Sequence, residues 1–422
     1  MILHGGDIAK SHAFGALCQG LAANSRTSFD SPSGSTGLKR AIQTIDFEAW
    51  RGRVDRLNIL HLVSYSLYSG PVSPTLGLAL EQRRGGHQVS IACDAKRGNF
   101  DGFEEPALPR LEASGLLADI GLTLSTKSSP LQLMRDVARL RARFTQGDLD
   151  ILHVHMSHDH TLATVARQGI RSPPRVVRTF HASRSLEDRL GQGLLNRSAD
   201  GWIVRTQGDR DRVLEKFSLP AERTRLISGS VDTELFVPSS TEERARAKRE
   251  LGLPEDSVVL GHVALIADRG QRELLDALDT RRSTQLHLMY VGRGQDESAV
   301  RAVVEERGLS DRVHFAGYLR DEALLRAYSA MDAAFVAGPG NDASVRAALE
   351  AMSCGLPVIG VRGGAVTDYL EENRGYLVDA RDGSAIAAAI DLMIENDVGR
   401  ERGLASRQFV QRSHAGPQEA QA

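Results

Sequence analysis

Short apolar segments of strand length alternate with helix-like stretches along most of this chain. The first is the uninterrupted apolar segment at residues 57–64, and further segments follow as far as residues 357–361. Uninterrupted apolar strands are typical of parallel sheets that helices cover on both faces. Strands alternating with helices of roughly ten to fifteen residues predict successive βαβ units, and therefore an α/β fold.

The length of the chain predicts more than one domain. A chain of 422 residues is too long for a single core. A connector at residues 226–236 separates two sets of βαβ units, so we expect two Rossmann-like domains that face a cleft. The expected parts are a poorly ordered N-terminal extension, a first and a second Rossmann-like domain and a polar tail, at residues 1–56, 57–236, 237–400 and 401–422.

Composition excludes several classes of protein. The formal net charge of -2 provides no global field that would attract nucleic acid. No apolar run reaches the length of a membrane span, and the N-terminus lacks the basic-then-apolar order of a signal peptide. Cys18, Cys93 and Cys354 lie far apart, without metal or redox spacing. These features favour a cytoplasmic protein.

The segment at residues 338–360 carries the strongest functional signal. Gly338 and Gly340 loosen a loop, Asp342 can cap the helix that follows, and Gly355 can end it. A helix start offers unpaired N–H groups to a phosphate, and Glu350, two turns further on, can accept hydrogen bonds from hydroxyls. The segment therefore predicts a sugar-nucleotide site. The alternative is an ordinary strand–helix loop with a capping aspartate.

This segment resembles the Glu-x7-Glu motif of the retaining glycosyltransferases of family 4 (group 1), which have the GT-B fold. Asp342 stands in the first position and Glu350 in the second. The resemblance covers about residues 57–400. It implies transfer of a sugar, with retention, from a nucleotide-diphosphate sugar to an acceptor hydroxyl in cell-surface glycan or glycolipid assembly. It also implies no metal and no cofactor besides a UDP- or GDP-linked donor.

The resemblance also implies how the donor is held. Arg269 and Gly270 resemble the family's Lys-Gly pair at the diphosphate, whereas Ala264 occupies the position of the usual second cation. Our hypothesis is that Arg346 replaces that cation. The full set of residues expected at the donor is Gly70, Arg269, Gly292, Gly294, Gly317, Tyr318, Ser344, Val345, Arg346 and Glu350.

The first domain is expected to hold the acceptor. His181 follows an apolar strand and resembles the family's strand-terminal histidine near the reactive carbon, so we expect it to be catalytic together with Asp342 and Arg269. We expect His158, Asp159 and His160 to line the acceptor pocket.

Two other polar patterns in the first domain have alternative interpretations. His153 and His155 share one face of a predicted strand, which makes a metal site conceivable, although no spacing completes it and we expect none. Arginines recur every four residues on the predicted helix 130–144. They indicate either peripheral contact with the inner face of a membrane or an ordinary solvated helix face; they are Arg135, Arg139 and Arg143.

Three rival functions remain to be weighed. A sugar-nucleotide 2-epimerase shares the expected fold, and a non-catalytic protein could bind the same donor without turnover. A dinucleotide-dependent oxidoreductase would need a Gly-x-Gly-x-x-Gly loop after the first strand, which residues 64–74 lack. The remaining expected partners are a glycan or lipid-linked acceptor, without nucleic acid.

Overall fold

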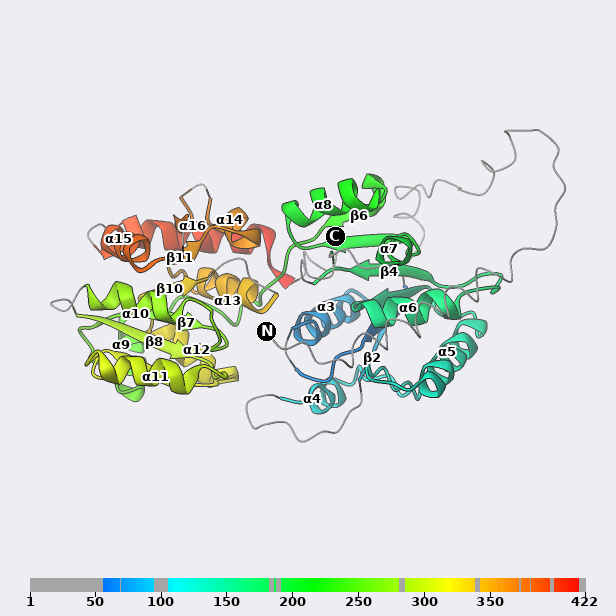
Figure 1. Ribbon diagram of the computed structural model, residues 1–422, viewed down its shortest axis with the longest axis horizontal. Coiled ribbons are helices and arrows are strands. Elements are labelled where there is room, and N and C mark those ends of the chain that lie inside the picture. The colour runs from blue at the N-terminus through cyan, green and yellow to red at the C-terminus, as the bar shows by residue number, and fades with distance from the viewer. Residues whose placement is uncertain are drawn as a thin grey trace. The chain divides into compact units, whose positions relative to one another are not determined.

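The structure is a computed structural model (Figure 1). It describes residues 56–68, 70–94, 105–181, 186, 191–280, 285–337, 342–371, 373–379, 381–394 and 398–416, without side chains at 342–345 and 398. These residues all belong to one compact unit, Asp55–Ala422. The expected N-terminal extension, 1–56, lies outside the described residues except for its last residue.

The first half of the described chain is built on a parallel sheet. Its strands are ordered β2-β1-β3-β4-β5-β6. Their bounds are β1 Asn58–Val63, β2 Gln88–Cys93, β3 Ile151–Val154, β4 Arg175–Thr179, β5 Gly201–Val204 and β6 Thr224–Leu226. The helices are α3 Val72–Arg84, α4 Ala107–Ser114, α5 Pro130–Thr145, α6 Ser157–Ala166, α7 Gln192–Asn196, α8 Gln207–Phe217 and the 3-10 turn η2 Ala221–Arg223.

The second half repeats this plan with a second parallel sheet, ordered β12-β11-β10-β7-β8-β9. Its strands are β7 Val258–Val263, β8 Leu286–Val291, β9 Val313–Gly317, β10 Ala333–Val336, β11 Val358–Val361 and β12 Tyr376–Val378. Its helices are α9 Thr241–Glu250, α10 Gln271–Asp279, α11 Glu297–Glu306, α12 Asp321–Ala330, α13 Asp342–Ser353, α14 Gly364–Leu370, α15 Gly383–Ile394 and α16 Val398–Ser413.

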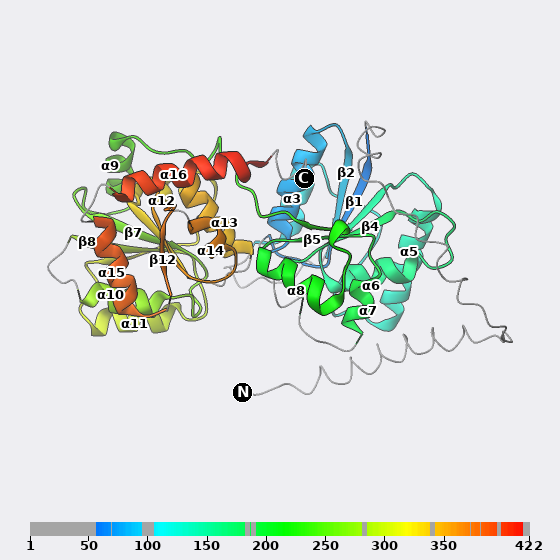
Figure 2. The same ribbon diagram turned by 90° about the horizontal axis from the view of Figure 1, so that it is seen from above.

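Burial of the strands explains why both sheets are parallel. In β1, five of six residues are buried, and all four residues of β10 and of β11 are buried. Such strands require a helix layer on each face, which the intervening helices provide (Figures 1 and 2). The expectation of two Rossmann-like α/β domains is confirmed.

Local signals fix several helix starts. Ser129 and Gln132 form a reciprocal capping box at the start of α5, and Pro130 occupies its first position. Ser240 and Glu243 do the same at the start of α9. None of the described helices is both long enough and apolar enough to cross a membrane.

Each sheet reverses its strand order at one place. In the first sheet the reversal lies between β1 and β3, and in the second it lies between β7 and β10. Loops leave such neighbouring strands in opposite directions, which opens a crevice at their carboxyl ends where ligands of α/β sheets bind. The two reversals therefore mark where to look for sites.

The expected polar tail, 401–422, is helical over most of its described part, which ends at residue 416. Most of it continues α16, which packs against α13 (Figure 2). Only Gly403, Ser406, Val410 and His414 are buried, three or four residues apart. Because so few of its residues face the core, the sequence of this segment is mostly polar although the segment is a packed helix. His414 then meets the connector, since its carbonyl oxygen accepts from Val231 N at 2.9 Å.

Candidate functional site

A pocket opens at the reversal of the second sheet. It is lined by the ends of β7 and β10 and the residues after them: His262, Val263, Ala264, Arg269, Phe335, Val336 and Ala337. Arg269 is the only arginine or lysine in this lining, and Ala264 lies on the same wall. The structure thus brings together the predicted cation and the position at which a second cation is absent.

Arg269 is held at the start of α10. Its backbone N–H donates to the side chain of Gln271 at 2.8 Å, and Gly270 forms the cap with φ of 89°. A Cβ at Gly270 would lie 2.8 Å from Phe335 Cε1, so the loop can follow this path only with glycine. The half-buried arginine and the helix start both favour an anion.

Gly292 and Gly294 serve packing between two loops. A Cβ at Gly292 would lie 2.0 Å from the carbonyl oxygen of Ala264, and one at Gly294 would lie 2.2 Å from that of Ile266. The same loops are joined by a hydrogen bond from Ile266 N to Arg293 O at 3.1 Å. The Gly-x-Gly turn therefore keeps the β8 loop against the β7 loop that forms the pocket.

Gly317 ends β9 and Tyr318 follows it, at the same sheet edge. Gly317 has φ of 74°, and its carbonyl oxygen accepts from Gly292 N at 2.8 Å. The Tyr318 side chain is partly exposed, and the guanidinium carbon of Arg320 lies 5.4 Å from the centroid of its ring. Partial burial raises the pKa of Tyr318 above its ordinary value. Its exposed ring can contact a ligand.

Glu350 is buried on α13 and has two polar partners. Tyr328 donates its hydroxyl to Glu350 Oε2 at 2.8 Å, and Arg346 Nε lies 3.4 Å from Glu350 Oε1. Burial raises the pKa of the Glu350 carboxyl, while the Arg346 charge and the Tyr328 hydrogen bond oppose that rise. Arg346 also donates to the Ser73 hydroxyl. In this arrangement Arg346 is bound to protein partners.

Other predicted donor residues are located only by the backbone. Asp342, Ser344 and Val345 lie in the first turn of α13, and their side chains are outside the described residues. Gly70 lies in the β1–α3 loop with φ of 50°.

His181 lies just past β4 and is buried. Its Nε2 is 2.7 Å from Nδ1 of His155, which follows β3. Because β1, β3 and β4 are neighbours, this pair lies beside the reversal of the first sheet. The predicted catalytic histidine is therefore at a carboxyl edge of strands, as expected.

Asp159, expected at the acceptor, faces the protein interior in this structure. Asp159 is fully buried, and its oxygens accept from the backbone N–H groups of Ser64 at 2.8 Å and Met156 at 2.8 Å, and from the Ser64 hydroxyl. Burial raises its pKa to about 6. These bonds tie the start of α6 to the end of β1, so the carboxylate has a structural task.

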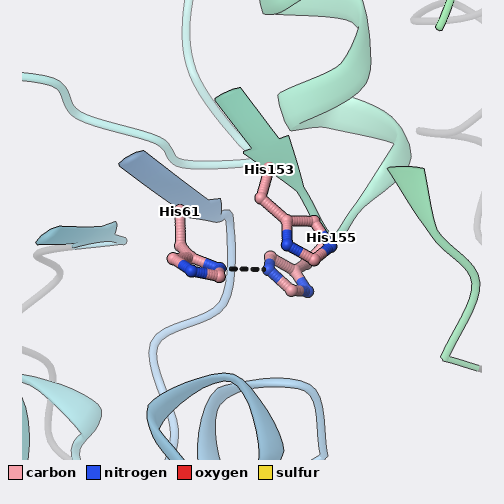
Figure 3. Close-up of side chains that lie close together, drawn as sticks. All are labelled: His61, His153 and His155. Carbon is pink, nitrogen blue, oxygen red and sulfur yellow. Dashed lines mark hydrogen bonds between the residues drawn. The ribbon is translucent and has the colours of Figure 1, made fainter. Parts of the chain in front are cut away.

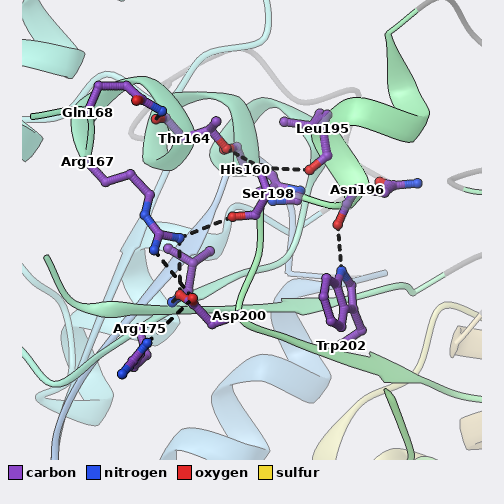
Figure 4. Close-up of polar contacts among 11 residues, drawn as sticks. His160, Thr164, Arg167, Gln168, Arg175, Leu195, Asn196, Ser198, Asp200 and Trp202 are labelled. Carbon is purple, nitrogen blue, oxygen red and sulfur yellow. Dashed lines mark hydrogen bonds and ion pairs between the residues drawn. The ribbon is translucent and has the colours of Figure 1, made fainter. Parts of the chain in front are cut away.

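His160 also points into the protein, contrary to expectation. Its Nε2 lies 3.1 Å from the hydroxyl of Ser198, which lies 2.7 Å from the hydroxyl of Thr164 (Figure 4). The buried residues of α6 are 159, 160, 162, 163 and 166. The polar start of this segment resembles a loop in the sequence, so it gives no sign that two of its side chains face inward. His158 is half-buried, so among the three expected acceptor residues it is the one with partial exposure.

His61 joins His153 and His155 in a buried cluster (Figure 3). The sequence interpretation missed His61, although a histidine inside an apolar strand, as in β3, was a usable signal. The rings are nearly parallel, with interplanar angles of 22–33° and centroids 4.3–5.3 Å apart. Nδ1 of His61 and Nε2 of His155 lie 3.0 Å apart, which is hydrogen-bond distance.

The basic residues of α5 have mixed surroundings. Arg139 donates to the Gly121 carbonyl oxygen and Arg143 pairs with Asp148, whereas Arg135 is exposed. Leu131 and Met134, at the start of the helix, are exposed by 54% and 57%. The exposed face of α5 thus combines these apolar side chains with the exposed residues Arg135, Arg139 and Arg141.

Two family models match the chain in succession. Residues 70–235 match the model described as Glycosyltransferase Family 4, and residues 243–408 match Glycosyl transferases group 1. The boundary between them coincides with the connector between the two sheets.

Individual relatives agree with these models. The chain is 28% identical over 365 residues to a phosphatidyl-myo-inositol mannosyltransferase of Mycobacterium leprae, covering 83% of this chain and 90% of that protein. It is 27% identical over 287 residues to a D-inositol 3-phosphate glycosyltransferase of Acidothermus cellulolyticus, covering 61% of this chain and 62% of that one. The chain thus spans about three fifths of the length of that relative.

A solved structure shares the fold. The structure of Anabaena HepE in complex with UDP and glucose superposes with a TM-score of 0.70 at 18% identity, covering 86% of this chain and 97% of that one. With two Rossmann-like sheets in the GT-B arrangement and both family models in sequence, this chain belongs to the group 1 glycosyltransferases of family 4.

Proposed function

We propose that the protein transfers a sugar from a nucleotide-diphosphate sugar to an acceptor hydroxyl, with retention of anomeric configuration. The observation that carries the proposal is the position of Arg269, in a pocket at the strand reversal of the second sheet and beside the start of α10. A cation and a helix N-terminus at one strand edge suit a diphosphate. Glu350, buried on α13, suits ribose hydroxyls.

The chemistry follows from the charge that develops. As the bond between sugar and diphosphate breaks, negative charge grows on the leaving phosphate, and its stabilisation is the largest contribution to catalysis. Arg269 and the backbone N–H groups of Ser344 to Arg346 would supply it without a metal. Attack on the same face as the leaving group lets the phosphate take the acceptor proton. Asp342 and His181 would hold the sugar hydroxyls.

The donor is proposed to be UDP- or GDP-linked, with no further cofactor. Two relatives are named for inositol-containing acceptors, which makes inositol phosphates and inositol lipids the first acceptors to test. We extend the proposal to a glycan or lipid-linked acceptor in general.

Peripheral membrane contact is proposed for the start of α5. Leu131 and Met134 are exposed beside Arg135, a combination that suits the surface of an anionic bilayer. The described cysteines, Cys93 and Cys354, are free and buried, which is consistent with work on the cytoplasmic side. Co-sedimentation with phosphatidylglycerol vesicles should fall in Leu131→Gln/Met134→Gln; equal binding would contradict this contact.

The experiment that tests the donor site is a thermal-shift screen against UDP, GDP, ADP and their sugars. Arg269→Ala and Glu350→Ala should each abolish most of the shift given by the best ligand. Arg307→Ala is the matched control, because Arg307 pairs with Asp276 at the C-terminal end of α11, away from the carboxyl edge of the strands. Unchanged binding in both site variants would refute the donor site.

Turnover separates the proposed activity from its rivals. Release of free nucleoside diphosphate that depends on an acceptor supports transfer. An epimerase instead yields a changed sugar without an acceptor, and a binding protein gives thermal shifts without any product.

A further inference from the structure

Arg269 lies between two residues with a left-handed backbone. Asp268 has φ of 46° and Gly270 has φ of 89°. Glycine adopts this conformation freely, whereas the Cβ of Asp268 disfavours it. Other contacts must therefore hold the peptide group that joins Asp268 to Arg269. The direction in which the Arg269 side chain leaves the loop depends on that peptide group.

The buried side chain of Gln271 holds this peptide group from inside. The backbone N–H of Arg269 donates to Gln271 Oε1 at 2.8 Å, and Gln271 Nε2 donates to the carbonyl oxygen of Leu265 at 3.0 Å. An N–H can only donate and a carbonyl oxygen can only accept, so these two contacts fix the orientation of the amide. One side chain, exposed by only 2%, thus joins both ends of the loop from Leu265 to Arg269.

His262 supports the same amide from β7. Its Nδ1 lies 3.0 Å from the carbonyl oxygen of Phe335, so Nδ1 donates, and its Nε2 lies 3.3 Å from Gln271 Nε2. Burial lowers the pKa of His262 to about 4, against the opposing effect of hydrogen bonds with the Phe335 and Arg269 backbone. The ring is therefore neutral near pH 7, and its Nε2 accepts the second proton of the amide.

Arg381 holds the same peptide group from outside. Its Nη1 donates to the carbonyl oxygen of Asp268 at 3.0 Å, and its Nη2 donates to the Asp268 carboxylate at 2.6 Å. Its Nε also lies 2.6 Å from Glu273 Oε1 on α10. The peptide group is thus held at its N–H by Gln271 and at its C=O by Arg381.

The direction of Arg269 matters because it is the one arginine or lysine in the described lining of the pocket, where Ala264 forms part of the same wall. We propose that Gln271 and Arg381 are positioning residues that hold the peptide group between Asp268 and Arg269 and so direct Arg269 towards the diphosphate of the donor. This proposal rests on the proposed function, in which that pocket binds the diphosphate. A single cation contributes to binding only where its guanidinium points at the phosphates.

Hydrogen exchange tests the inner contact without any ligand. In the full chain labelled with nitrogen-15 arginine, the Arg269 amide should exchange slowly, because its N–H is bonded to a buried side chain. Gln271→Met has a similar volume but no amide, so it should speed this exchange about 10-fold. Arg269→Lys identifies the signal. An Arg269 amide that exchanges equally fast in the parent and in Gln271→Met would overturn the proposal.

Binding of a nucleoside diphosphate compared with its nucleoside tests the consequence, by calorimetry with whichever base gives the largest thermal shift. Gln271→Met should weaken binding of the diphosphate about 10-fold and leave that of the nucleoside within about 2-fold. Arg381→Ala removes an exposed side chain without disturbing the core, and should weaken the diphosphate about 3-fold. Equal losses for both ligands, or no loss for the diphosphate, would overturn the role of the residue replaced.

Two controls separate positioning from stability. Tyr290→Phe removes the hydroxyl that donates to the backbone carbonyl oxygen of Gln271 at 2.9 Å, and leaves the side-chain amide in place. Arg249→Ala removes another exposed ion pair, which Arg249 makes with Glu255 at 2.8 Å. Both variants should keep the parent ratio of diphosphate affinity to nucleoside affinity. A changed ratio in either would refute the positioning argument.

A double variant decides whether Gln271 acts through Arg269. Gln271→Met in an Arg269→Ala background should weaken diphosphate binding no further, because the group that it positions is gone. A second loss as large as the first would overturn the proposal. If the parent binds no nucleoside diphosphate, the proposed function fails, while the exchange experiment still decides whether Gln271 holds the peptide group.

Discussion

The buried histidines should make the first half of the protein labile in acid. His61, His153, His155 and His160 are all buried, and burial lowers the pKa of each, to about 4 for His61 and about 3 for His160. In the unfolded chain these imidazoles return to an ordinary pKa near 6.5. The unfolded state therefore binds more protons below that pH, and the free energy of unfolding falls as the pH falls.

The size of the effect follows from these pKa values. Between pH 7 and pH 5, His61 alone removes about 2 kcal/mol from the free energy of unfolding, and His160 removes a similar amount. Asp159, whose pKa is raised to about 6, gains a proton in the native state over this range. It therefore adds about 1 kcal/mol to the free energy of unfolding, in the opposite direction. The net loss is a large part of the roughly 5–15 kcal/mol that stabilises a typical domain.

Urea unfolding at pH 7, 6 and 5 measures this loss. Trp202 is buried in β5, so a Trp50→Phe background leaves its fluorescence as the reporter of the first half. His61→Gln in the same background should make the free energy of unfolding less dependent on pH, by about 2 kcal/mol over this range. Equal pH dependence in the two proteins, or a parent as stable at pH 5 as at pH 7, would refute the reasoning.

Two further predictions concern the second half. Tyr328→Phe removes the hydroxyl that bonds the buried Glu350, and should cost about 1–3 kcal/mol in urea unfolding; an unchanged midpoint would show that another group replaces the hydroxyl. Gly292→Ala places a Cβ 2.0 Å from the Ala264 carbonyl oxygen, and should lower the melting temperature and weaken nucleotide binding together. Gly208→Ala, where nothing lies within 4 Å, is its control, and equal effects would refute the packing argument.

The sequence predicts the sheets well because their evidence is redundant. Most strands, such as β1 and β10, are largely apolar runs, and the pattern recurs along the chain. The position of Arg269 was predictable for the same reason, since it follows one of these strands. The edge of a parallel sheet is implied by the order of the strands alone.

Side-chain direction was much harder to predict. The segment from His158 to His160 is polar and follows a strand, yet two of its three side chains turn inward because α6 starts immediately. His61 and His155 are 94 positions apart in sequence, yet their side chains meet between neighbouring strands, and His61 also contacts Gln82 on α3. Spacing along one strand cannot indicate such partners. In α16 the buried stripe was too narrow for its polar composition to reveal.

The close packing of the loops after β7 and β8 affects how a Gly-x-Gly turn in a sequence should be interpreted. Each of the two glycines, Gly292 and Gly294, faces a carbonyl oxygen that would collide with any larger residue. A descendant that had lost every catalytic group would still need both to stay folded. The presence of this Gly-x-Gly turn in a distant homologue therefore indicates that the fold is intact. It does not indicate whether that homologue transfers a sugar.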